Sequence, residues 1–135
     1  MRIRKQIVEQ LMSHAKKEVP LEACGYLAAK GGIITALYEM RNVDKSGEHF
    51  SFDPKEQFAA ARDARTKGLE ICAVYHSHPA SPARPSEEDI RLAHDPQIFH
   101  VIVSLAKGSE DIKAFMIKNK SVEPVVLEVV DNAGI

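Results

Sequence analysis

A run of mostly apolar residues, from Leu69 to Tyr75, is followed within ten residues by three prolines and then by a helix start. The run favours a buried strand, because β-branched and aromatic side chains suit a covered, pleated surface. Proline continues neither a central strand nor a helix, so the chain after the strand has to be an irregular loop. Ser86 as an N-cap, with acidic and then apolar residues behind it, predicts a short helix from 86 to about 93.

His76 and His78 lie at the end of this predicted strand, and Asp89 falls in the first turn of the predicted helix. Residues two apart in a strand point to the same face, so both imidazoles can bind one metal ion. A catalytic zinc site has three protein ligands and leaves the fourth position to water. We therefore predict one Zn²⁺ per chain, bound by His76, His78 and Asp89. Helix capping explains Ser86 and Asp89 about equally well, and that interpretation stays open.

The string HSHP at 76–79, followed by Ser86 and Asp89, resembles the signature of the JAMM or MPN+ metalloproteases. That family also carries a catalytic glutamate within Glu-x-x-Gly-x-Leu, which the string EACGYL at 22–27 matches. Eukaryotic members often have Gly-Trp before Tyr-His-Ser-His, where this chain has Ala-Val at 73–74 and no tryptophan. The chain is therefore more similar to the minimal, stand-alone prokaryotic members, including those that process sulfur-carrier proteins.

The resemblance implies a role for each site residue. Glu22 would be the general base that accepts a proton from water and passes it to the leaving amine, and Ser86 would donate a hydrogen bond to the oxyanion. The implied substrate is a ubiquitin-like or sulfur-carrier protein cut after its C-terminal Gly-Gly, with no ATP or organic cofactor. From its position alone, Glu22 would be a solvated strand end. The alternative function is a non-catalytic scaffold domain of the same fold, although that branch has typically lost the site residues that this chain retains.

Length and charge limit the remaining options. The chain has 135 residues, 44% of them hydrophobic, which predicts a single domain over residues 1–135. A net charge of −1 provides no basic excess for phosphate contacts, so nucleic acid is not an expected partner. No continuous apolar stretch follows the basic N-terminus, so we expect neither a signal peptide nor a membrane span, and a cytoplasmic location. Cys24 and Cys72 are expected to be reduced there. The oligomeric state is not indicated.

The hydrophobic pattern predicts helices and strands in alternation. Further helices are expected at 3–18 and from Pro54 to about Lys67, and further strands at 21–29, 33–40, 49–52, 99–105, 111–118 and 124–130, with a turn at 107–110 and a frayed end at 131–135. Hairpins and a strand-helix-strand crossover together indicate an α/β fold with a single mixed sheet flanked by helices on both sides. The family resemblance implies the same architecture, with a curved sheet and the metal at one edge.

The other histidines show no comparable pattern. His14, His94 and His100 are predicted to be surface or packing residues, whereas His49, in a polar loop, could overhang the site. Cys24 could line the site because it should share a strand face with Glu22, although a buried structural thiol is the simpler account. Two other enzyme classes with similar histidine motifs are excluded. Amidohydrolase barrels need about 250 residues, and zinc deaminases need a Pro-Cys-x-x-Cys motif that is absent here.

Overall fold

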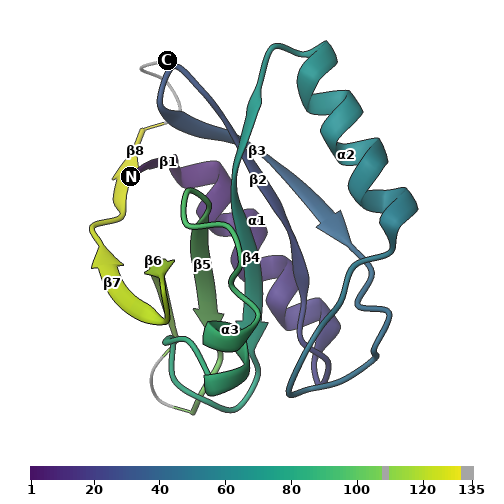
Figure 1. The fold of residues 1–135 in the computed structure, drawn as a ribbon, viewed down its shortest axis with the longest axis vertical. Helices are drawn as coiled ribbons and strands as arrows, with labels where there is room; N and C mark the ends of the chain where they lie inside the picture. Colours follow the sequence, from purple (N-terminus) through teal and green to yellow (C-terminus); the bar gives the residue numbers. More distant parts are fainter. Residues whose placement is uncertain (108–109, 132–135) are drawn as a thin grey trace.

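The computed structural model describes residues 1–107 and 110–131, and an eight-stranded sheet forms its centre (Figure 1). The strands are β1 (Arg2–Arg4), β2 (Cys24–Lys30), β3 (Ile33–Met40), β4 (Glu70–His78), β5 (Phe99–Ser104), β6 (Asp111–Lys118), β7 (Ser121–Val125) and β8 (Glu128–Val130). The helices are α1 (Lys5–Glu18), α2 (Pro54–Thr66) and α3 (Glu87–Arg91). No helix in this part of the chain has both the length and the apolar character needed to cross a membrane.

The sheet has the order β7-β6-β5-β4-β2-β3-β1-β8 and contains both strand orientations. Strand β4 lies in its interior, antiparallel to β2 and parallel to β5. The connection from β4 to β5 contains α3, as a parallel pair requires a crossover rather than a tight turn. The sheet curls so that β7 and β8 lie to one side of β5 and β6 (Figure 1). The predicted α/β class, with one mixed and curved sheet, is confirmed.

Side-chain alternation along the strands divides the apolar residues between the two faces of the sheet. Helix α1 covers one face through Ile7, Leu11 and Ala15, all of which are buried. Helix α2 covers part of the other face, where Ala60 packs near Cys24 and near Phe50 and Phe52 of the loop before the helix. The main core beneath α1 comprises Ile3, Ile7, Leu11, Ala15, Leu27, Ile34, Ala73, Tyr75, Val101, Val103 and Ala114. The face of the sheet opposite α1 carries the smaller apolar cluster, and the site described below lies on that face.

Two predicted boundaries near the N-terminus are wrong. The helix expected at 3–18 begins only at Lys5, because Ile3 is fully buried in a strand that pairs in parallel with both β3 and β8. Backbone pairing on both sides outweighs the helical periodicity that Ile3 also satisfies. The strand expected at 21–29 begins at Cys24, which leaves Glu22 in the irregular segment before it. Glu22 is therefore held by loop contacts and not by a strand ladder.

Other predicted elements also differ in extent. Residues 49–52 are not a strand; Phe50 and Phe52 contact each other and the face of β2 through their rings. The strand expected at 124–130 is two strands, β7 and β8, which pair with different neighbours. The helix expected from 86 to about 93 covers only Glu87–Arg91. The centre of the turn expected at 107–110, and all but the first residue of the end expected to fray at 131–135, lie outside the described residues.

Candidate metal centre

His76 and His78 lie within the last three residues of β4, which extends three residues beyond the predicted end of the strand. Both side chains project to the same face, and both are buried, with exposed fractions of 2% and 4%. Their Nε2 atoms lie 3.1 Å apart. His76 pairs with β2 on one side and with β5 on the other, and His78 pairs with β5. The pair is therefore rigid and lies on an interior strand, which corrects the expectation of a metal at one edge of the sheet.

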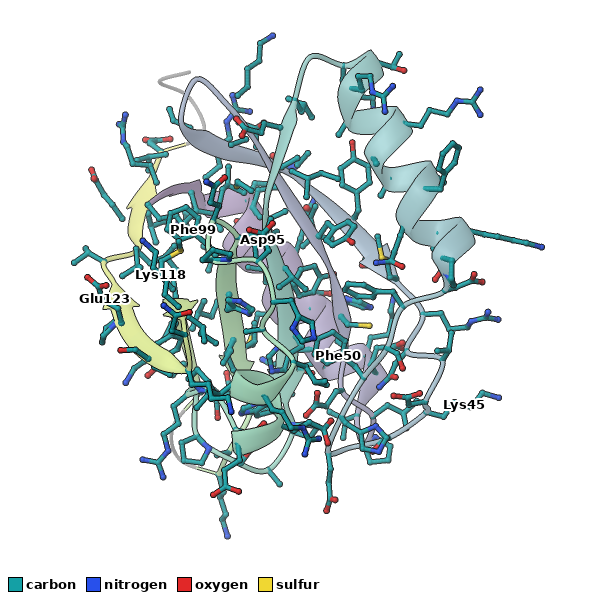
Figure 2. All side chains as sticks on the ribbon, viewed as in Figure 1. Lys45, Phe50, Asp95, Phe99, Lys118 and Glu123 are labelled. Atoms are coloured by element: carbon teal, nitrogen blue, oxygen red, sulfur yellow. The ribbon has the colours of Figure 1, made fainter. Side chains whose placement is uncertain are left out.

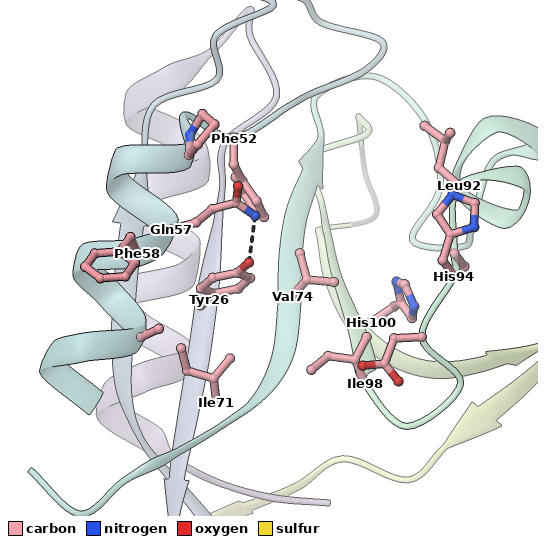
Figure 3. Close-up of a pocket in the computed structure, with 14 residues that line it drawn as sticks. Tyr26, Phe52, Gln57, Phe58, Ile71, Val74, Leu92, His94, Ile98 and His100 are labelled. Atoms are coloured by element: carbon pink, nitrogen blue, oxygen red, sulfur yellow. Dashed lines mark hydrogen bonds between the residues drawn. The ribbon is translucent and has the colours of Figure 1, made fainter. Parts of the chain in front are cut away.

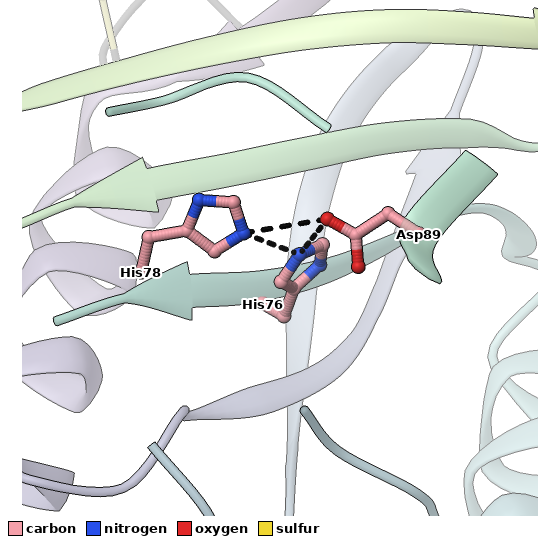
Figure 4. A group of neighbouring side chains, drawn as sticks. All are labelled: His76, His78 and Asp89. Atoms are coloured by element: carbon pink, nitrogen blue, oxygen red, sulfur yellow. Dashed lines mark hydrogen bonds and ion pairs between the residues drawn. The ribbon is translucent and has the colours of Figure 1, made fainter. Parts of the chain in front are cut away.

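Asp89 reaches the two imidazoles from the first turn of α3 (Figure 4). Its Oδ2 atom lies 3.0 Å from Nε2 of His76 and 3.3 Å from Nε2 of His78. The same oxygen accepts a hydrogen bond from the Ser86 backbone N–H at 2.9 Å, and Ser86 Oγ accepts one from the Asp89 N–H at 3.0 Å. This reciprocal pair is a capping box, which stabilises the helix start. The cap also orients the carboxylate of Asp89 toward the two imidazoles, so capping and metal binding are compatible at this residue.

The three convergent atoms fit a tetrahedral metal ion. Zinc bonds of about 2.0–2.1 Å in a tetrahedral site place neighbouring ligand atoms roughly 3.3 Å apart, close to the contacts seen here. The Nδ1 atom of His78 lies 2.8 Å from the Pro82 carbonyl, which accepts its proton. In the neutral imidazole, that bond leaves a lone pair on Nε2, directed toward His76 and Asp89. A cation at the centre of the triangle would satisfy all three atoms.

The electrostatics of the group favour a cation in the same place. Burial opposes ionisation of the Asp89 carboxyl, but contacts with His76 and His78 outweigh that effect and hold its pKa well below the usual range. Burial also opposes charge on His78, yet the Asp89 carboxylate and the Pro82 carbonyl raise its pKa. Asp89 is therefore an anion at neutral pH, as a metal ligand has to be.

Glu22 approaches the group from the irregular segment before β2. Its backbone N–H donates to the Ser46 carbonyl at 2.8 Å, and its carbonyl accepts from Asn42 Nδ2 at 3.1 Å. The side chain is only 3% exposed, and Oε1 has no hydrogen-bond partner among the described residues. Burial, together with the negative charge of Asp89, raises the pKa of Glu22 to about 8, although His78 acts in the opposite direction. The backbone is thus firmly held while the carboxyl group is available for a proton.

Ser86 is exposed at the start of α3, and its Oγ acts as the acceptor in the helix cap. A hydroxyl group can accept and donate at once, so the Ser86 hydrogen remains available for another acceptor. The cap is therefore part of the structure, while donation to an oxyanion stays a prediction.

Two residues that hold the segment around Glu22, one from the histidine strand and one from the loop after β3, were not predicted from the sequence. Ser77, between the two histidines, is buried on the opposite face of β4, where its Oγ accepts from the Ala23 N–H at 2.7 Å. Its own N–H donates to the Ala23 carbonyl at 2.9 Å. Asn42 is buried as well, and its side-chain amide donates to the carbonyls of Glu22, Ser46 and His49. Strand alternation indicates that Ser77 faces away from the metal ligands, but nothing in the sequence indicates its partner.

The loop between β3 and α2 contributes one aromatic side chain to the site. Phe50 stacks on the His76 ring, with the ring centroids 4.7 Å apart and an interplanar angle of 26°. In Figure 2 Phe50 lies inside the molecule, whereas Lys45 of the same loop projects outward. His49 does not join the group of potential ligands; its Nδ1 lies 3.0 Å from an Asp44 carboxylate oxygen on the exposed side of the loop. Phe50 therefore limits water access to His76.

Cys24 lies directly opposite His76 in the β2–β4 register and is fully buried. The thiol packs beside Met40 and Ala60, and burial raises its pKa to about 12. Glu22 precedes the strand, so the expectation that Cys24 shares a strand face with it does not apply. A protonated, buried thiol is a packing residue, which agrees with the simpler of the two accounts.

Among the other histidines, only His100 lines the hollow beside the site. This hollow, of about 220 Å³, is lined by Phe50, Val74, His76, Glu88, Asp89, Leu92 and His100. His100 faces it because His100 lies opposite Val74 in the β4–β5 register, on the face that carries His76. His14 instead lies on the buried side of α1, where its Nδ1 is 2.8 Å from the Tyr75 hydroxyl. Alternation in the predicted strand at 99–105 was the signal that could have placed His100 on the site face.

A family model and several proteins of known name match most of the chain. The sequence model of prokaryotic homologues of the JAB domain matches residues 4–118. The CysO-cysteine peptidase of Mycobacterium tuberculosis is 34% identical over 104 residues, which cover 76% of this chain and 71% of that protein. The desampylase of Pyrococcus furiosus is 31% identical over 101 residues, covering 75% of this chain and 70% of the relative.

Solved structures agree with these matches. Protein DSY2949 of Desulfitobacterium hafniense is 38% identical, with a TM-score of 0.89, over 98% of this chain and 94% of that one. The JAB1/MPN domain protein AF2198 of Archaeoglobus fulgidus is 26% identical, with a TM-score of 0.67, over 96% of this chain and 99% of its own. The extent of the sequence match and the shared fold lead to one conclusion: the chain belongs to the JAB1/MPN/JAMM family, in the group formed by its prokaryotic homologues.

Proposed function

We propose that residues 1–135 form one zinc-dependent peptidase domain that hydrolyses the bond after the C-terminal Gly-Gly of a ubiquitin-like or sulfur-carrier protein. The observation that carries this proposal is the convergence of His76, His78 and Asp89 on one point, with contacts of 3.0–3.3 Å, near a Glu22 carboxyl group whose Oε1 has no partner in the described residues. The name of one relative, CysO-cysteine peptidase, supports the reaction class.

The proposed metal is Zn²⁺, one ion per chain, held by His76, His78 and Asp89. Zinc with three protein ligands and an open position supplies Lewis-acid chemistry, which makes water a stronger acid and polarises a carbonyl group. The hydrogen bond from His78 to Pro82 orients that ring, and the capping contact with Ser86 orients the Asp89 carboxylate. The protein thus presents a preorganised set of ligands with their outer contacts in place.

Glu22 is the proposed general base. Its carboxyl group is buried, and a raised pKa brings its proton affinity close to neutral pH, where a general base works best. A bound cation beside it would favour the ionised form, ready to take a proton from water. The same carboxyl group then holds the proton until the leaving amine accepts it. Ser77 and Asn42 position the backbone around Glu22 and do not touch the reacting atoms.

A scaffold domain of the same fold is the second candidate function. Such a domain would bind a partner without turnover and would have no need for an unpartnered buried carboxyl group next to three potential ligands. Burying Glu22 without a hydrogen-bond partner costs free energy, and a cost of this kind is typical of functional sites. The retained chemistry therefore favours the enzyme.

The decisive experiment uses carriers with a Gly-Gly terminus extended by cysteine or by a short peptide. We expect the zinc-loaded protein to remove the extension, as measured by intact mass, and expect a zinc chelator to stop the reaction. Restoring zinc should restore cleavage. Failure of the fully zinc-loaded protein to cleave any extended carrier would support the scaffold function instead.

Ser86→Ala should lower turnover by roughly 10²-fold, which is the scale for loss of one donor to an oxyanion. The same change removes the cap on α3 and should cost about 1 kcal/mol of stability. Ser86→Gly separates the two effects, because glycine is a tolerable N-cap but has no hydroxyl group. We expect Ser86→Gly to unfold close to the wild-type temperature while losing as much turnover as alanine. Normal turnover in a destabilised Ser86→Ala protein would limit Ser86 to capping.

A further inference from the structure

His100 has a buried ring nitrogen that the fold does not use. The side chain is 9% exposed, and its Nε2 has no hydrogen-bond partner in residues 1–107 and 110–131. Burying a polar atom without a partner costs free energy, so such atoms in native proteins call for an explanation. A ligand that supplies the missing partner is one such explanation.

The His100 side chain lies at a junction between two hollows. The hollow of about 220 Å³ beside His76 and Asp89 shares Val74, Leu92 and His100 with a groove of about 760 Å³. In Figure 3 the His100 ring lies between Val74 and the segment that carries Leu92 and His94, with α2 on the far side of the groove. A substrate chain that runs from the metal centre into the groove would pass the three shared residues, His100 among them.

The walls of this groove are mainly apolar and aromatic. Tyr26 and Phe52 pack edge to face on its floor, and Phe58 of α2 is 69% exposed at its rim. The Tyr26 hydroxyl accepts a hydrogen bond from Gln57 at 2.9 Å, so those two polar groups already have partners. His100 therefore stands out as a buried polar group with unused hydrogen-bonding capacity.

Strand β4 has no free backbone edge to offer an extended substrate, because β2 and β5 pair with it on both sides. Side chains then become important as partners for the buried peptide groups of a tail. The register places His100 one strand across and two residues along from His76, a separation of roughly 8 Å between backbone positions. An extended chain rises about 3.3 Å per residue, so His100 lies level with the second or third peptide group from the metal centre.

We propose that His100 is a specificity-determining residue, which hydrogen-bonds through Nε2 to the second or third main-chain peptide group on the acyl side of the scissile bond. This inference rests on the proposed function, because it assigns a place to the extended tail of that substrate. The acyl side is chosen because the groove beyond His100 has room for a tail, whereas the leaving group can be as small as one amino acid. Burial, and then the nearby His76, lower the pKa of His100, so the neutral ring offers one N–H and one lone pair.

The test compares the zinc-loaded protein on three carriers, in which each of two ester carriers differs from the amide carrier in one backbone atom. A cysteine-extended carrier is prepared with all amide bonds, and again with an ester at the second or the third acyl-side peptide group. The ester removes the N–H and weakens the carbonyl as an acceptor, so it reports on both tautomers of His100. We expect His100→Leu to lower kcat/KM for the amide carrier about 10- to 100-fold, mainly through KM, but by less than about 3-fold for one of the two esters.

His100→Gln should restore most of the amide activity, because its side-chain amide can reach a similar position and form the same kind of bond. His94→Leu is the matched control: its ring is exposed in the same groove, so it should affect amide and ester carriers equally. Zinc content is measured for every variant. Equal loss on amide and ester carriers in His100→Leu, or no loss at all, would overturn the assignment.

The result that would contradict the proposed function differs from the result that would contradict the role of His100. A wild-type protein that is loaded with zinc but cleaves no amide carrier would overturn that function, and this inference with it. If His100→Leu does not fold, wild-type protein and His100→Gln still decide the question. Equal kcat/KM of the wild-type protein for the amide carrier and for both ester carriers would show that no hydrogen bond is made there.

Discussion

Glu22→Gln is expected to retain one zinc ion per chain while losing roughly 10²- to 10⁴-fold in turnover, the usual contribution of a general base. Glutamine has nearly the same shape but cannot accept the proton. None of the three convergent ligand atoms belongs to Glu22, so metal binding should persist. Metal analysis and single-turnover intact mass on the same sample provide both measurements. Loss of zinc together with activity would make Glu22 a ligand or a structural residue instead.

Glu48→Gln is the matched control, since Glu48 is an exposed carboxylate whose charge acts on Glu22. It should keep both zinc and most turnover.

In the metal-free protein, the effect of Glu22→Gln on the free energy of unfolding should depend on pH. Burial raises the pKa of Glu22 from 4.5 to about 8 in the folded state. Below about pH 4.5 the folded and unfolded states both carry the proton, and Glu22 imposes no penalty. As the pH rises from 4.5 to 8, only the unfolded chain releases its proton, and folding becomes less favourable by a final amount on the order of 5 kcal/mol. In urea unfolding, Glu22→Gln should therefore stabilise the metal-free protein more at pH 8 than at pH 5.

His76→Ala combined with His78→Ala should abolish stoichiometric zinc binding and, with it, measurable turnover. Removing a residue that only orients a ligand weakens metal affinity by about 10- to 100-fold, so removing two ligands has to cost more. Asp89→Ala is expected to lose zinc as well, and its helix start should also weaken because the capping box is broken. Metal analysis after dialysis against a weak chelator is the measurement.

His49→Ala is the control for these variants, because His49 lies in the loop near the site but pairs with Asp44 on the exposed side. It should retain one zinc per chain. Full zinc occupancy in the doubly substituted His76→Ala, His78→Ala protein would show that the metal binds elsewhere.

Several features of the site could be read from local sequence. Residues two apart in a strand share a face, so the proximity of His76 and His78 follows from the apolar run before them. The cap residues Ser86 and Asp89 are three apart, which is the spacing of a capping box, and the structure contains that box. Local rules succeeded here because the strand and the helix start each depend on neighbouring residues only.

Other features depend on contacts between residues far apart in the chain. Ile3 matches a helical repeat, yet it forms a strand because β3 and β8 supply hydrogen bonds on both sides. Phe50 and Phe52 resemble a strand but pack through their rings, and residues 49–52 join none of the eight strands in a ladder. Glu22 is not on a strand, and its position depends on Asn42, Ser46 and the strand that bears Ser77. Periodicity contains no information about these partners.

The sequence by itself determined which residues form the candidate metal-binding group, and it determined the α/β class, because residue spacing and alternation are local properties of the backbone. The tertiary structure alone decided that His76 and His78 lie on an interior strand, with β2 and β5 on either side. It also decided that Glu22 is buried without a side-chain partner in the described residues, and that His100 faces the passage into the groove. Burial and unmet hydrogen-bonding capacity arise only when distant segments pack together, so no local pattern can contain them.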